Sequence, residues 1–219
     1  MIALSGIRNG GRIVKALPAD AHATAVLNEW AADSESLLDV AGLDLSGADI
    51  SGADLANGLF TESVLRGVNL SGADLYRSHM EGAELSEADL SGATLVKTVL
   101  DESSLIRANL DRADLGSSEM WSVDAREASF RHAKLDGAGL LHVKLQGADL
   151  SNASVQQTSF QVVMDEQTVV LGLAGTVFGP ASVVEGGELR EFAGVDLEVW
   201  LNSRGARVQV LSPQGPQGQ

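Results

Sequence analysis

The chain has 219 residues, a formal net charge of −15 and no cysteine. This length fits one domain with a sizeable core, and the lack of cysteine excludes disulfides and thiolate chemistry. Because phosphate would repel so acidic a protein, direct binding to nucleic acid is disfavoured, and the charge serves either solubility or a basic partner.

Residues 1–38 are predicted to form an N-terminal hairpin and a capping helix. Residues 2–4 and 13–15 flank Asn9-Gly10, which is a favoured turn pair in hairpins. A helix is expected from Ala21 to Ala32, because four apolar residues recur there at helical spacing. These are Ala23, Val26, Leu27 and Trp30. We expect this helix to cover the exposed end of the structure that follows.

The stretch from Leu43 to Phe160 repeats every five residues without a slip. Every fifth position from Leu45 is apolar, and the position two before it is small or Val, except for Leu43 at the start. The 24 repeat positions are Leu45, Ile50, Leu55, Phe60, Leu65, Leu70, Leu75, Met80, Leu85, Leu90, Leu95, Leu100, Leu105, Leu110, Leu115, Met120, Ala125, Phe130, Leu135, Leu140, Leu145, Leu150, Val155 and Phe160. At Ala125 the small and large residues are exchanged, because Val123 precedes it.

A five-residue period fits neither a helix nor a flat strand. It requires a backbone that turns once per repeat, always in the same sense, with one large and one small residue inward. Four such sides close a square coil of 20 residues, so residues 39–160 are predicted to form about six coils. Coils stacked through parallel strand-type hydrogen bonds rise ~4.8 Å each.

The repeat resembles the pentapeptide-repeat family. The resemblance rests on units such as Ala48-Asp49-Ile50-Ser51-Gly52, Ala88-Asp89-Leu90-Ser91-Gly92 and Ala113-Asp114-Leu115, which match the family's A(D/N)LXX unit. It implies an all-β fold, a right-handed quadrilateral parallel β-helix, here with short N- and C-terminal capping helices.

Surface positions 20 residues apart form columns along such a coil. Two columns are rich in acidic residues, and we take their aspartates as candidate partner-binding residues: Asp49, Asp89 and Asp149 in one, Asp54, Asp74 and Asp114 in the other. The alternative is that these side chains bond to neighbouring backbone in the turns. Trp121 and Leu141 are also candidates, because they would form an exposed apolar patch, by chance or for a partner or a second copy.

Residues 161–211 are predicted to form an irregular C-terminal cap. Short apolar runs between glycines indicate strands up to residue 194, a short helix is expected near Asp196, Gly205 suits its end, and residues 207–211 read as a strand. We expect homodimerisation through an apolar set in this segment, Leu197, Trp200, Leu201, Val208 and Val210. Residues 212–219 are predicted to be disordered.

The sequence offers no convincing site for catalysis, a cofactor or a metal. His132 and His142 are half a coil apart and would face opposite sides. A filled solenoid also lacks the concave pocket that would perturb carboxylates for catalysis. No run approaches the ~20 apolar residues of a membrane span, and no secretory signal is recognisable. We therefore expect a cytoplasmic, non-catalytic binding protein.

Two kinds of partner are consistent with these features. Some pentapeptide-repeat proteins resemble B-form DNA in width and charge, bind DNA gyrase and protect it from quinolones or other poisons. The acidic rod and the C-terminal helix–Gly–strand segment of this chain are similar to theirs, although Leu replaces Phe at most centres and no loop interrupts the coils. The alternative is a rigid scaffold or adaptor for an unrelated protein.

Overall fold

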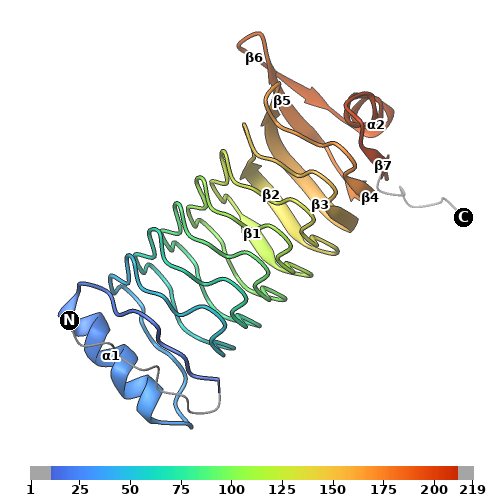
Figure 1. Ribbon diagram of the computed structural model, residues 1–219. Helices are drawn as coiled ribbons and strands as arrows, with labels where there is room; N and C mark the ends of the chain where they lie inside the picture. The colour runs from blue at the N-terminus through green and yellow to red at the C-terminus, as the bar shows by residue number, and fades with distance from the viewer. Residues whose placement is uncertain (1–10, 212–219) are drawn as a thin grey trace, which may run out of the picture.

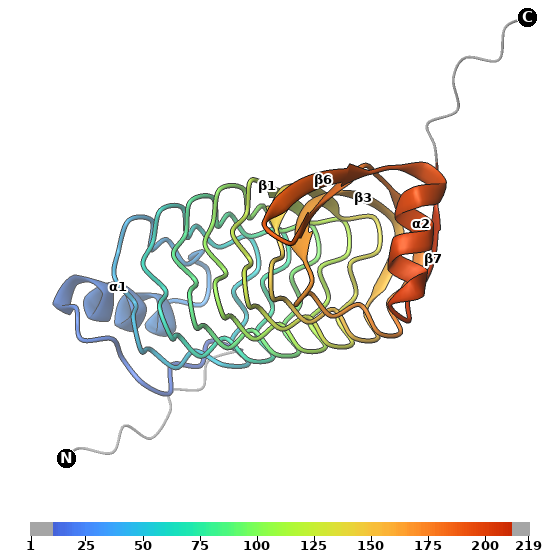
Figure 2. The same ribbon diagram turned by 90° about the horizontal axis from the view of Figure 1, so that it is seen from above.

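A computed structural model describes residues 11–211 as a rod of stacked square coils with a helix at each end (Figure 1, Figure 2). Each coil takes 20 residues, and parallel bridges join positions 20 apart from Asp39↔Leu59 to Asp149↔Val169. The predicted parallel β-solenoid is therefore confirmed. Its pairing begins one repeat before Leu43 and continues beyond Phe160.

The core is a column of the two inward-facing series. All 24 large repeat positions, from Leu45 to Phe160, are at most 2% exposed. The small positions are equally buried, including Val123 beside Ala125, as the exchange of volumes predicts. Gly58 shows why the second series is small, because a Cβ there would lie 2.7 Å from the ring of Phe60.

Each corner of a coil is a β-turn with a left-handed third residue. In one such turn the N–H of Ala48 donates to the carbonyl of Leu45 at 3.0 Å, and Gly47 has φ 72°. This is the pattern of a type II turn, which favours Gly or Asn at its third residue. Fifteen non-glycine residues nevertheless occupy such positions, Lys97 and Glu102 among them.

The N-terminal end is covered by helix α1, which spans Ala21–Ala32 as predicted. Asp20 caps it by accepting a hydrogen bond from the N–H of Ala23 at 2.7 Å. Leu27 and Trp30 are buried and belong to the common core, so the cap role of Trp30 is confirmed.

The first arm of the predicted N-terminal hairpin lies outside the described residues. The second arm runs antiparallel along the first coil. The N–H of Asp49 donates to the carbonyl of Ala16 at 3.0 Å, and the N–H of Asp54 donates to that of Gly11 at 2.8 Å.

The repeat is lost after Phe160, but the coil is not. Strands β1 (Glu119–Trp121), β2 (Gly139–Lys144) and β3 (Ser154–Asp165) stack in parallel on one another. The register drops one residue between Leu141 and Val143, so that Val143 pairs with Val162, and it is restored by Asp149↔Val169. The expected irregular structure is thus a further coil of uneven sides.

The C-terminal end is closed by four strands and a helix. They are β4 (Ala174–Phe178), β5 (Ala181–Glu185), β6 (Glu188–Phe192), α2 (Gly194–Ser203) and β7 (Arg207–Val210). Strand β4 pairs in parallel with β3 and β7, whereas β5 pairs with β3 and forms a hairpin with β6. The predicted helix and final strand are confirmed, with Gly205 left-handed (φ 89°) just after α2. The proposed disorder of residues 212–219 lies outside the described residues.

Candidate protein-binding surface

The square cross-section gives the rod four sides of different charge. We name the four sides after the first four large repeat residues: the Leu45, Ile50, Leu55 and Phe60 sides. Residues 40–160 contain 18 acidic and 9 basic residues, and all nine basic residues belong to the first three sides. The basic residues are Arg66, Arg77, Lys97, Arg107, Arg112, Arg126, Arg131, Lys134 and Lys144.

The Phe60 side carries acidic residues and no lysine or arginine. It consists of units 58–62, 78–82, 98–102, 118–122, 138–142 and 158–162. Its five acidic residues make up more than half of the net charge of residues 40–160: Glu62, Glu81, Asp101, Glu102 and Glu119. Hydrogen bonds from Thr61 and His79 lower the pKa of Glu81 against the opposing effect of its partial burial. The Glu81 carboxylate therefore keeps its negative charge at neutral pH.

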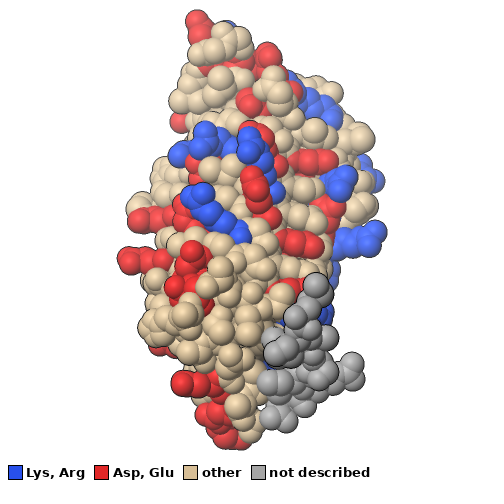
Figure 3. Space-filling model, turned by 60° about the vertical axis from the view of Figure 1, so that its left-hand side comes forward, with Lys and Arg blue, Asp and Glu red and all other residues tan. Residues whose placement is uncertain are grey.

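On the other sides, many acidic residues are neutralised by ion pairs between neighbouring coils. Arg107 contacts Glu127 of the next coil at 2.8 Å and Glu87 of the previous coil at 3.8 Å. Arg131 pairs with Asp111 at 2.7 Å, and Lys134 pairs with Asp114 at 3.1 Å. Figure 3 shows a face on which the two signs of charge lie side by side. Sequence reasoning missed this contrast because it followed the aspartates of the repeat unit.

The six predicted partner-binding aspartates lie on the Ile50 and Leu55 sides, and each is tied to its own turn. One carboxylate oxygen of each accepts a hydrogen bond from the N–H two residues later. The distance is 2.8–3.0 Å for Asp49, Asp74 and Asp149. Asp54, Asp89 and Asp114 make the same bond. The alternative that these side chains bond to neighbouring backbone in the turns is therefore confirmed. Partner binding by these aspartates stays a prediction.

Asp49 differs from the other five because the N-terminal segment covers it. The Lys15 ammonium lies 2.5 Å from the hydroxyl of Ser51, which in turn donates to Asp49 at 2.7 Å. Partial burial alone would raise the pKa of the Asp49 carboxyl, but the bonds from Ser51 and the Lys15 charge outweigh it and hold this pKa below its usual range.

Trp121 and Leu141 are neighbours on the Phe60 side. They are paired in the register of β1 and β2. Trp121 is 45% exposed, Leu141 is half-buried, and the N–H of Trp121 donates to Asp101 at 2.7 Å. The structure thus brings the predicted apolar patch together with acidic residues that were not predicted to accompany it.

The predicted dimerisation set lies mostly inside the chain's own core. Leu197 and Leu201 are fully buried, Val208 and Trp200 are 4% and 8% exposed, and Val210 is partly buried. The indole N–H of Trp200 donates to Glu185 at 2.8 Å. These residues close the end of the solenoid, which accounts for the apolar surplus noted in the sequence. Dimerisation itself stays a prediction.

The described residues show few features suited to chemistry. Within residues 11–211, no three His, Cys, Asp or Glu side chains are grouped as metal ligands, and none of the helices described is long and apolar enough to span a membrane. A depression of about 550 Å³ on the Ile50 side is lined by Ser91, Asn109, Asp111, Arg131 and His132 among others. Of the charged residues that line it, Arg131 and Asp111 are paired with each other.

The chain is similar in part to several solved structures. None of the curated proteins searched matches the chain. A solved pentapeptide repeat protein of the Arabidopsis thaliana thylakoid lumen is 32% identical over 52% of this chain and 69% of its own, with a TM-score of 0.38. Another, Rfr23 from the cyanobacterium Cyanothece 51142, is 25% identical over 59% and 89%, with a TM-score of 0.39. QnrB1, a plasmid-mediated fluoroquinolone resistance protein, is 14% identical over 80% and 94%, with a TM-score of 0.48.

The family description "Pentapeptide repeats (8 copies)" matches residues 44–82, 83–121 and 123–161. These three matches cover over half of the chain and coincide with the stacked coils. The chain therefore belongs to the pentapeptide repeat family.

Proposed function

We propose that this protein is a non-catalytic binding protein whose Phe60 side docks on a basic surface of a protein partner. The observation that carries the proposal is the unequal distribution of charge, with five acidic residues and no lysine or arginine on one side. A field of one sign steers a basic partner and favours one orientation of the rod.

Trp121 gives this side an apolar anchor. Exposed tryptophan is enriched among residues that dominate binding energy at protein interfaces. Trp121 is paired in register with Leu141 of the next coil, and its N–H donates a hydrogen bond to Asp101 of the previous coil. The combination of an exposed aromatic side chain and nearby acidic residues resembles the anatomy of protein interfaces more than that of a surface evolved for solubility alone.

The partner we would test first is DNA gyrase, as an expectation of the family resemblance and of the acidic rod. Basic DNA-binding surfaces are suited to such a field. The match to DNA would be one of shape and overall charge, because coils spaced ~4.8 Å apart cannot reproduce one phosphate charge per ~1.7 Å of axis.

A supercoiling assay with two matched variants tests the proposal. The first variant, Glu62→Gln/Glu102→Gln/Glu119→Gln, removes three charges from the Phe60 side. The control, Glu84→Gln/Glu87→Gln/Glu127→Gln, removes three charges from the Leu45 side. We expect the wild type to inhibit supercoiling or drug-induced cleavage, the first variant to lose this effect, and the control to keep most of it.

Salt provides a second readout, because the screening length falls from about 10 Å at 0.1 M to about 3 Å at 1 M. Binding should weaken steeply over this range. Equal loss of binding in the Phe60-side variant and the Leu45-side control would assign binding to the overall charge. A third variant, Asp74→Lys/Asp114→Lys, tests the Leu55 side, and a loss of binding in this variant alone would assign binding to that side. No effect of the wild type up to roughly tens of micromolar would favour the scaffold alternative.

A further inference from the structure

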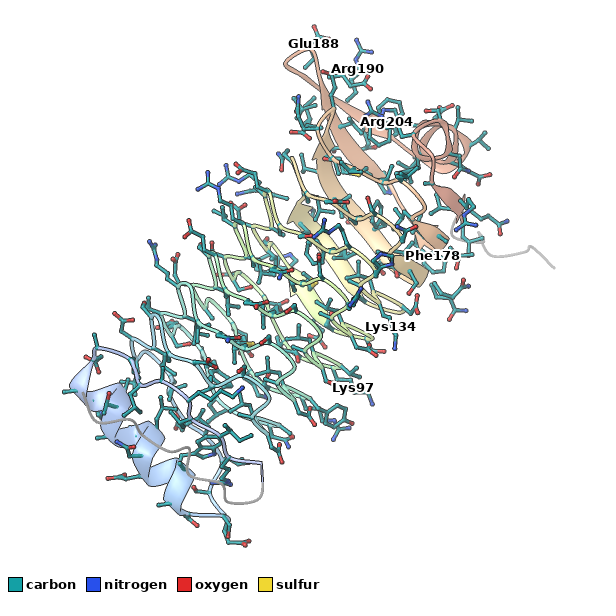
Figure 4. All side chains as sticks on the ribbon, viewed as in Figure 1. Lys97, Lys134, Phe178, Glu188, Arg190 and Arg204 are labelled. Atoms are coloured by element: carbon teal, nitrogen blue, oxygen red, sulfur yellow. The ribbon has the colours of Figure 1, made fainter. Side chains whose placement is uncertain are left out.

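Strand β6 is an edge strand that projects from the C-terminal end of the rod. Among residues 11–211 it pairs only with β5, and four of its five residues, Glu188 to Glu191, are exposed. Figure 4 shows Glu188 and Arg190 at the outer tip of the hairpin, away from the coils. Leu189 is 65% exposed between them. A free edge with an exposed leucine is a template for pairing with another strand.

The hairpin geometry fixes which backbone groups face outward. Gly186 and Gly187 form a two-residue turn and both have positive φ, 57° and 86°. The flanking pair Glu185↔Glu188 is therefore hydrogen-bonded, and bonded and non-bonded pairs alternate from there. Val184↔Leu189 is consequently a non-bonded pair, so the N–H and C=O of Leu189 point to the free edge.

The side chains around Leu189 are complementary in charge to the same side chains of a second copy of β6. In an antiparallel pair of β6 strands centred on Leu189, each Glu188 lies opposite the other copy's Arg190, and the two leucines meet on the axis. A two-fold axis at Arg190 would place Arg190 opposite Arg190, and an axis at Glu188 would place Glu188 opposite Glu188. Like charges directly opposite each other are destabilising. The charges on this edge therefore disfavour other registers while favouring this one.

We propose that two copies of this chain associate through an antiparallel β6–β6 pair with its two-fold axis at Leu189. The contact is isologous, so it closes as a dimer and leaves no free β6 edge. It uses none of the buried residues that hold α2 and β7 on the solenoid. It also stands independently of the Phe60 side and of the partner proposed for it.

Cysteine scanning tests the axis directly, because the natural chain has no cysteine. In a hydrogen-bonded pair the two Cα atoms lie about 5.5 Å apart, which is within the range for a disulfide. Leu189→Cys should therefore form a disulfide-linked dimer under mild oxidation. Glu191→Cys is the matched control, because its two copies would be four residues apart along the strands, roughly 13 Å. Equal cross-linking of both variants would overturn the proposed axis.

A charge exchange tests the register. In light scattering, we expect a dimer for the wild type and a roughly tenfold weaker dimer for E188R or R190E, since each puts like charges opposite. The double variant E188R/R190E should restore the dimer. Arg207→Glu, on the exposed face of β7, is the control and should leave the dimer unchanged. A wild-type monomer at high micromolar concentration, or a dimer broken by Arg207→Glu but not by E188R, would overturn the proposal.

Discussion

At the scale of single residues, the corners of the coils explain the glycine content of the chain. The third residue of each turn is left-handed, and Gly47, Gly52, Gly72 and Gly92 occupy this position without a Cβ. Left-handed backbone costs other residues roughly 1–2 kcal/mol. The fifteen non-glycine residues at equivalent positions show that the stacked coils can impose this conformation.

Gly92→Ala should lower the free energy of unfolding by about 1 kcal/mol. Its φ is 65°, and a Cβ there would meet no other atom within 4 Å, so the cost is conformational. Gly139→Ala is the matched control, because Gly139 has no positive φ and its Cβ would touch only the Ser118 carbonyl at 3.9 Å. Urea unfolding of both variants checks the prediction, which an equal loss in the two would contradict.

Asp111 should make stability depend on pH. Partial burial would raise the pKa of its carboxyl, but hydrogen bonds from Arg131 and Ser129 and the charge of Arg131 hold it below the usual range. A lowered folded pKa stabilises above the unfolded value of about 3.9, and this contribution disappears as pH falls through the folded value. Because Arg131 is exposed, the contribution at neutral pH should be about 1 kcal/mol or less.

The measurement compares the wild type with Asp111→Asn. We expect the difference between their unfolding free energies to be constant from pH 7 to pH 5 and to vanish towards pH 2. A difference that is unchanged at low pH would mean that the variant is destabilised by lost packing instead of lost charge.

At the scale of elements, the sequence was sufficient wherever one inward residue recurred in phase. The 24 large positions could be assigned from periodicity alone, and α1 from four apolar residues at helical spacing. The coil after Phe160 could not be assigned, because the register loses one residue after Leu141 and regains it before Val169. Such a compensated shift depends on hydrogen bonds between coils and leaves no period in the sequence.

The candidate surface was only partly predictable for a different reason. Trp121 and Leu141 were found because neither occupies an inward position. The acidic Phe60 side could have been found by adding the charges on each side of the 20-residue coil. The ion pairs of Arg107 and Arg131 could not have been found, because side-chain conformations decide which acidic residues are neutralised.

Helix α1 and its preceding segment should be required for solubility. Deleting residues 1–38 would expose the core face of the first coil, including Leu45 and Ile50, together with unpaired backbone at Asp49. Bare coil ends associate with one another. We expect the truncated protein to aggregate in size-exclusion chromatography, and a monodisperse truncation with an unchanged melting temperature would contradict the capping role.

At the scale of the whole molecule, stability should add up along the rod, because each coil contacts only its neighbours. A charge in the middle of the column would separate the coils on either side. Leu90→Asp is therefore expected to prevent folding, because it buries an unpaired carboxylate between two coils. Circular dichroism of Leu90→Asp beside the exposed control Glu102→Asp checks this, and a folded Leu90→Asp protein would contradict a dry core.

Because one coil takes 20 residues, the number of residues between two points of the rod also sets their relative rotation about its axis. Duplicating one full coil would lengthen the rod by ~4.8 Å and keep the β5–β6 hairpin above the same side. Removing a single five-residue repeat would instead swing everything downstream through a quarter turn. The angle between the acidic side and the projecting hairpin is thus fixed in steps of a quarter turn, one for each five-residue repeat. A family of such rods could therefore vary length and orientation separately.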